Sequence, residues 1–87
     1  MKKILCFGDS NTYGYNPQDG SRFKEDERWT GIFKQLCKSN FEVVEDGCNN
    51  RTCFSDNPFD NMTGYNAINK HLNNKYDLII LQIGIND

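Results

Sequence analysis

The sequence has no long run of apolar residues, and this absence limits where the protein can work. A membrane-spanning helix needs about 20 predominantly apolar residues, and the most apolar stretch here, Leu78 to Ile83, is far shorter. Near the N-terminus only Ile4 to Phe7 are apolar, whereas the apolar part of a secretion signal has about 7–15 residues. We therefore expect a cytoplasmic protein with no membrane partner.

An excess of one charge and a set of metal ligands are also missing. The chain has 10 Lys and Arg against 12 Asp and Glu, so it carries no basic footprint for nucleic acid. Cys48 and Cys53 share one loop, but a zinc site would need two more ligands, and His71 is the only histidine. We expect reduced thiols, no metal, no cofactor and no nucleic-acid partner.

The first half of the chain has the pattern of a strand, a loop and a helix. The apolar run that stops at Gly8 predicts a buried strand, and the polar residues 8–25 predict a long loop. Apolar residues then recur at helical spacing, with Asp26 and Glu27 suited to the first turn. The predicted apolar face consists of Trp29, Ile32, Phe33, Leu36 and Cys37.

The second half repeats this pattern and ends on a third strand. Residues 41–44 predict a strand, and their acidic flanks favour an edge position. A polar loop, residues 47–58, leads to a weaker helix over residues 60–74. The apolar residues 78–83 predict a central strand covered on both faces.

The order β-α-β-α-β predicts a flavodoxin-like fold, a three-layer α/β/α sandwich around a parallel sheet with right-handed crossovers. Loops that follow the strands then begin at Gly8, Gly47 and Gly84 and meet at one edge of the sheet. The chain stops at Asp87, directly after its most apolar strand. Because an open strand edge is unfavourable, we expect further sequence or a pairing partner there.

Each of these loops carries a residue suited to acyl transfer. Ser10 follows the first strand, where its hydroxyl can act as a nucleophile, and Asp9 is expected to brace the turn. The segment Gly47 to Thr52 can present backbone N–H donors, and Asn86 offers a side-chain amide. A nucleophile with convergent donors is what stabilises a tetrahedral oxyanion.

The three segments together resemble the SGNH (GDSL) hydrolases, in particular their arylesterase-like or acyltransferase-like branch. Gly8 to Gly14 matches the block GDSxTxG, and Gly84 to Asp87 matches GxND. The resemblance implies that Ser10 is the nucleophile and that its N–H, the N–H of Asn50 and the side chain of Asn86 form the oxyanion hole. Arg51 is expected to be a structural or rim cation.

The chain departs from the family pattern at two points. Asn50 stands where the family usually has a small residue, although a backbone donor survives that change. The DxxH-like block with the catalytic histidine and aspartate has no match in residues 1–87, which are therefore expected to form a partial SGNH domain. His71 is expected at the far edge of the sheet, as a solvated histidine at a helix end.

The leading prediction is a serine esterase that hydrolyses, or transfers the acyl group of, small carboxylic esters. The partners are then a small-molecule ester and a complementing C-terminal segment. One alternative is a flavodoxin-like module that binds a phosphate or nucleotide at the turn after the first strand. Another is an inactive fragment that associates with itself or with another chain.

Overall fold

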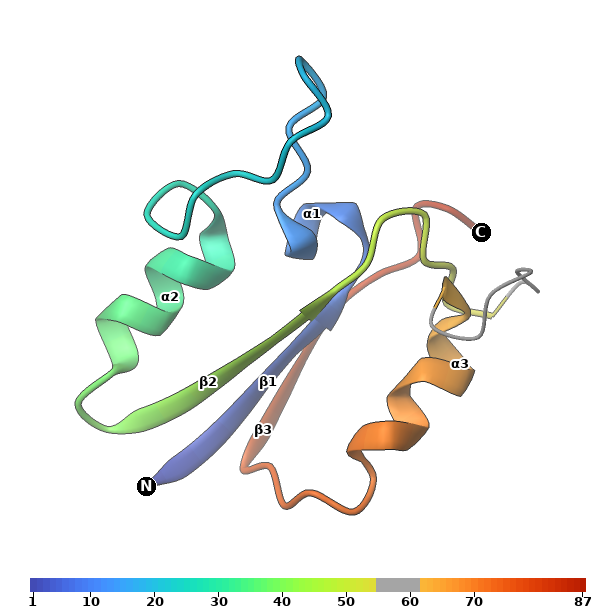
Figure 1. The fold of residues 1–87 in the computed structure, drawn as a ribbon. Helices are drawn as coiled ribbons and strands as arrows, with labels where there is room; N and C mark the ends of the chain where they lie inside the picture. The colour runs from blue at the N-terminus through green and yellow to red at the C-terminus, as the bar shows by residue number, and fades with distance from the viewer. Residues whose placement is uncertain (55–61) are drawn as a thin grey trace.

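The computed structural model describes residues 1–54 and 62–87 and contains a three-stranded parallel sheet (Figure 1). The strands are β1 (Lys2–Gly8), β2 (Phe41–Gly47) and β3 (Leu78–Gln82), in the order β2-β1-β3. Both neighbours run parallel to β1. The predicted β-α-β-α-β order and α/β fold class are confirmed, as is the edge position of the second strand.

The third strand lies at an edge of the sheet that the described residues form, with the open side that the sequence predicts there, and its central position in a larger sheet stays a prediction. β1 occupies the centre, and its residues Ile4 to Phe7 are buried. β3 pairs only along its β1 side in the described sheet, and Leu81 is 61% exposed. An apolar run indicates that a strand tends to be buried. Whether that strand lies at the centre or at the edge of the sheet depends on which strands pair with it.

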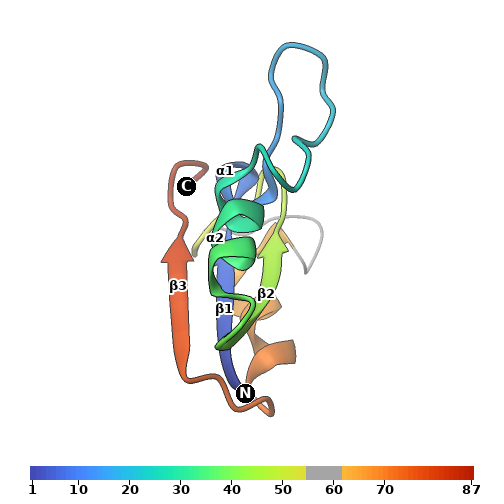
Figure 2. The ribbon, with the colours of Figure 1, turned by 90° about the vertical axis from the view of Figure 1, so that its left-hand side faces the viewer.

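Helices cover both faces of the sheet and complete the predicted three layers (Figure 2). Helix α2 (Trp29–Cys37) packs on the face where Ile4 and Cys6 point. Helix α3 (Gly64–Ala67), with the 3₁₀ helix η2 (Ile68–His71), packs on the face of Leu5 and Phe7. The two cores therefore alternate along β1, as the two-residue period of a strand requires.

The helices differ in detail from those predicted. Within the described part of residues 60–74, α3 and η2 together span only residues 64–71, and the last turn tightens to 3₁₀ geometry. Residues 60–61 lie outside the described residues. Helix α2 begins at Trp29, so Asp26 and Glu27 precede it in a turn. Its inner face carries Phe33 and Cys37, and Leu36 is 81% exposed.

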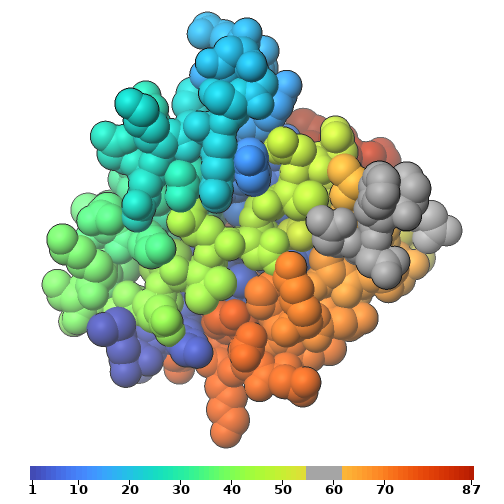
Figure 3. All heavy atoms as spheres, viewed as in Figure 1, coloured from blue at the N-terminus to red at the C-terminus, as the bar shows by residue number. Residues whose placement is uncertain are grey.

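The carboxyl ends of the strands gather three loops at one end of the molecule, as predicted. The Asp9 N–H donates to the Gln82 carbonyl over 3.2 Å, and the Cys48 N–H donates to the Gly8 carbonyl over 3.2 Å. A short helix, α1 (Ser10–Tyr13), lies within the predicted first loop. Beyond it, the residues leading to α2 project as a lobe (Figure 3).

In the described part of the chain, no helix is long and apolar enough to cross a bilayer.

Candidate active site

Ser10 is held at the first position of α1, directly beyond the end of β1. Asp9 precedes it as the N-cap, and its buried carboxylate accepts the Asn11 N–H over 3.1 Å. Gly14, with φ of 90°, ends the helix after a single turn. The expectation that Asp9 braces this turn is confirmed, and the half-buried Ser10 side chain has a fixed place at the sheet edge.

Two glycines let α1 sit directly on the strand ends. A Cβ at Gly8 would lie 2.2 Å from both the Gln82 carbonyl oxygen and Thr12 Oγ1. A Cβ at Gly47 would lie 2.2 Å from the Tyr13 nitrogen. Because real side chains do not approach this closely, any other residue at these positions would push α1, and Ser10 with it, away from the sheet.

Ser10 and Asn50 meet at a small cavity. The cavity holds about 210 Å³ and is lined by Ser10, Tyr15, Asn49 and Asn50. The backbone of Asn50 is left-handed, with φ of 65°. The structure therefore brings together two of the three residues that the sequence predicted for the site. Their catalytic roles stay predictions.

The loop after β3 is fastened to the loop after β2. Asn86 Nδ2 donates to the Arg51 carbonyl over 3.0 Å. The Asp87 carboxylate accepts the N–H groups of Cys53 and Phe54. The third predicted residue, Asn86, is thus tied to the residue next to Asn50. An asparagine amide has two N–H groups, so this bond leaves Asn86 a second donor.

Arg51 holds this end of the sheet together through more contacts than the sequence predicts. Its guanidinium is 1% exposed and lies over the Phe7 ring, 4.4 Å from the ring centroid. Nη1 donates to the carbonyls of Gly8 and Asp46, and Nη2 lies 3.1 Å from Asp46 Oδ1. A structural cation was expected, but the rim alternative is wrong because the guanidinium is buried.

The location and environment predicted for His71 are wrong. Its side chain is 10% exposed, and both ring nitrogens are engaged. Nε2 lies 2.7 Å from Asp46 Oδ2, and Nδ1 lies 3.2 Å from the Tyr76 hydroxyl. The histidine reaches Asp46 because η2 packs on the sheet face of Phe7, toward which Asp46 also points. With both nitrogens occupied, His71 is not arranged as a base for Ser10.

Asp46 gathers several positive charges on the α3 face. Burial by itself raises the pKa of this carboxyl, but the hydrogen bond with His71 and the charge of Arg51 outweigh it and hold the pKa below its ordinary value. Lys70 Nζ also lies 3.2 Å from Asp46 Oδ2. Asp46 is therefore a stable anion at pH 7 and a fixed counter-ion for Arg51.

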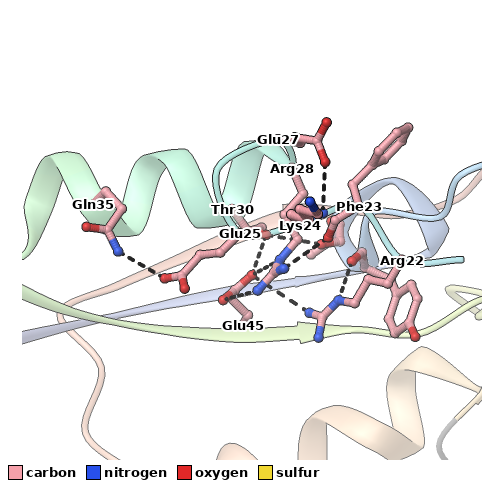
Figure 4. Close-up of polar contacts among 11 residues, drawn as sticks. Arg22, Phe23, Lys24, Glu25, Glu27, Arg28, Thr30, Gln35 and Glu45 are labelled. Carbon is pink, nitrogen blue, oxygen red and sulfur yellow. Dashed lines mark hydrogen bonds and ion pairs between the residues drawn. The ribbon is translucent and has the colours of Figure 1, made fainter.

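A second acidic centre on the opposite face anchors the projecting lobe (Figure 4). Arg28 makes a bidentate pair with Glu45, with contacts of 2.8 and 3.1 Å, and the Thr30 hydroxyl donates to the same carboxylate over 2.6 Å. The hydrogen bond from Arg28 is the main cause that lowers the pKa of Glu45 to about 2. Arg28 also donates to the Phe23 carbonyl, which ties the lobe to β2.

A larger cavity lies away from these residues. It holds about 520 Å³ near the start of β2, and its lining includes Met1, Lys38 and Phe41. None of the predicted site residues lines it. The smaller cavity is therefore the candidate active site, because it brings together Ser10 and Asn50, two of the residues that the sequence predicts for the site.

Comparison with known proteins places the chain in a family. Residues 4–87 match the family model described as GDSL-like lipase/acylhydrolase, and the chain belongs to that family. No curated protein gives a significant match.

Solved structures agree with this assignment. The chain is similar to a carbohydrate acetylesterase family member from Sinorhizobium meliloti, at 32% identity and a TM-score of 0.88. It is also similar to the native aryl esterase of M. smegmatis, at 43% identity and a TM-score of 0.78. Each match covers 100% of this chain but only 43% and 44% of the respective neighbour. The chain therefore spans less than half the length of these esterases.

Proposed function

We propose that this chain supplies the nucleophile and the oxyanion hole of a serine esterase. The observation that carries the proposal is the cavity that Ser10 and Asn50 line together. Membership in the GDSL family and similarity to esterases support ester hydrolysis as the reaction class. Small acyl esters are the proposed substrates, because one similar structure is a carbohydrate acetylesterase family member.

In this proposal the Ser10 hydroxyl attacks the ester carbonyl and forms a tetrahedral intermediate. The N–H groups of Ser10 and Asn50 and the amide of Asn86 bind its oxyanion. As the intermediate collapses, the base returns the Ser10 proton to the leaving oxygen, and the alcohol departs from an acyl-serine. Water then hydrolyses the acyl-serine, or a second alcohol accepts its acyl group. Fixed donors of this kind typically contribute about 10²–10³ in rate each.

The base that takes the Ser10 proton is proposed to lie outside residues 1–87. His71 is the single histidine of the sequence, and its nitrogens contact Asp46 and Tyr76. A complementing segment or a second chain would bring the missing base. The isolated chain is therefore expected to cleave esters weakly or not at all.

The phosphate-binding alternative is less favourable at this turn. Helix α1 has only four residues, and the Asp9 carboxylate already caps its N-terminus. An acidic side chain at that position disfavours a second anion. The acyl-transfer proposal uses the same turn for a neutral ester, which gains a single negative charge only in the tetrahedral intermediate.

The test uses two assays that depend on a reactive serine, applied to the protein as its native source makes it and to its variants. Hydrolysis of p-nitrophenyl acetate and labelling by a fluorophosphonate are compared for the wild type, Ser10→Ala and Ser39→Ala. The exposed Ser39 lies between α2 and β2 and serves as the matched control. We expect Ser10→Ala alone to abolish both signals. Equal activity in Ser10→Ala and the wild type would refute the proposal.

A further inference from the structure

We infer that Arg51 is a positioning residue that aligns the three parts of the proposed oxyanion hole. This inference rests on the proposed function and extends it, because it identifies the group that holds the parts in register. Arg51 lies between Asn50 and Thr52. Its side chain contacts the end of β1, and its carbonyl contacts the loop after β3.

The first link runs to the nucleophile. Arg51 Nη1 donates to the carbonyl of Gly8 over 3.3 Å, and Gly8 is the last residue of β1, two positions before Ser10. The same nitrogen donates to the carbonyl of Asp46 over 3.0 Å. The guanidinium therefore bridges the ends of two adjacent strands, where a shift would carry the Ser10 turn with it.

The second link runs to the amide donor. The Arg51 carbonyl accepts from Asn86 Nδ2, which fixes the rotamer of the side chain that the proposal assigns to the oxyanion. The left-handed Asn50 directly precedes Arg51 in the chain. The buried Arg51 side chain therefore also restrains the position of the Asn50 backbone. One side chain and its own backbone thus join Ser10, Asn50 and Asn86.

Only an arginine satisfies this arrangement. The planar fork reaches two carbonyls and one carboxylate oxygen at the same time, and its flat face stacks on Phe7. A lysine keeps the charge beside Asp46, but its single ammonium lacks the fork geometry. Arg51→Lys therefore tests the alignment of the three site residues while it keeps the positive charge beside Asp46.

The first experiment follows alignment directly in the ¹⁵N-labelled chain by NMR. In Arg51→Lys we expect the Asn86 side-chain amide and the backbone amides of Ser10 and Asn50 to shift and to exchange faster with solvent. The amides in the middle of β1 should keep their wild-type positions. Unchanged Asn86 and Asn50 signals in a folded Arg51→Lys chain would overturn the inference.

Arg28→Lys is the matched control, because Arg28 also forms a bidentate pair with a carboxylate of β2. Its effects should fall on the lobe and on Glu45 and leave Asn86 unchanged. Equal effects of both variants on Asn86 would also overturn the inference, since they would report a general loosening.

If Arg51→Lys does not fold, NMR measurements on the wild-type chain test the inference. A scalar coupling across the hydrogen bond from Asn86 Nδ2 to the Arg51 carbonyl, together with slowly exchanging Arg51 guanidinium protons, would support the inference. Rapidly exchanging guanidinium protons and no coupling would overturn it.

Kinetics on the protein from its native source then separate this inference from the proposed function. Because a misplacement of about 1 Å can cost about 100-fold in rate, we expect Arg51→Lys to lower kcat by about that factor with KM nearly unchanged. An active wild type with an equally active, folded Arg51→Lys variant would overturn the inference alone. A wild type without Ser10-dependent cleavage would overturn the proposed function, while the NMR comparison would still decide the role of Arg51.

Discussion

Glu45 and Asp46 are consecutive residues of β2, yet they organise opposite faces of the sheet. Glu45 points toward α2, where Arg28 and Thr30 bind it and fix the projecting lobe. Asp46 points toward α3, where His71 and Arg51 bind it, and Arg51 holds the loop of Asn50. The alternation of a strand thus lets one dipeptide hold two separate walls of the candidate active site.

The two centres differ in how deeply their arginines are buried. The Arg28 side chain is 12% exposed, whereas that of Arg51 is 1% exposed. Water can partly solvate Arg28 when its partner is lost, but it cannot reach Arg51 without a local opening. The Asp46 centre should therefore be the less tolerant of substitution.

Asp46→Ala tests this difference with the largest expected effect. Loss of one partner of a buried ion pair typically costs about 3–5 kcal/mol, and for a small domain this is enough to unfold most of the chain. The free energy of unfolding in urea measures it. Glu42→Ala is the control, since its ion pair with Lys3 is exposed and should contribute less than about 1 kcal/mol. A loss no greater than that of Glu45→Ala would break the comparison.

Acid unfolding probes the Glu45 centre. The pKa of the Glu45 carboxyl falls from an ordinary value of 4.5 to about 2 in the folded state. This stabilisation is fully present above about pH 4.5 and is lost as the pH falls toward 2, with a contribution of up to about 3 kcal/mol. Glu45→Gln should flatten this part of the stability curve, and Glu42→Gln should leave it unchanged. Because the pKa of Asp46 is also lowered, some loss of stability in acid remains in Glu45→Gln. A loss between pH 4.5 and 2 as large as that of the wild type would contradict the assignment.

His71→Gln should have the smallest effect. The variant loses the hydrogen bond with Tyr76 or weakens the one with Asp46, at a cost of about 1 kcal/mol. Because Tyr76 and Asp46 engage both ring nitrogens of His71, the histidine is not arranged as a base for Ser10, and Ser10 labelling should match the wild type. A tenfold drop in labelling with an unchanged melting temperature would show that His71 serves the nucleophile after all.

The sequence predicts the elements well because strands and helices depend on local patterns. The apolar run before Gly8 and the helical spacing around Phe33 each appear within a few neighbouring residues. The motif residues Ser10, Asn50 and Asn86 could be placed at one edge because parallel strands end on the same side. The structure confirms that placement for the described chain.

The contacts of Arg51 and His71 that support the candidate site could not be predicted from the sequence, for a different physical reason. Arg51 meets Gly8 across 43 positions of sequence, and His71 meets Asp46 across 25. A local pattern does not distinguish a charged residue that folds inward from one that stays in water. The register of β1 with β2, which pairs Phe7 with Asp46, brings Arg51 to Gly8, and the packing of η2 on this face brings His71 to Asp46.

The left-handed backbone at Asn50 has a consequence for how this position can vary. At a φ of 65°, glycine and asparagine are comfortable, whereas β-branched residues are strained. Asn50→Gly would therefore keep the backbone and its N–H in place, although it removes a side chain that lines the cavity. What this position requires is a direction of the main chain, and two residues with very different side chains can supply it.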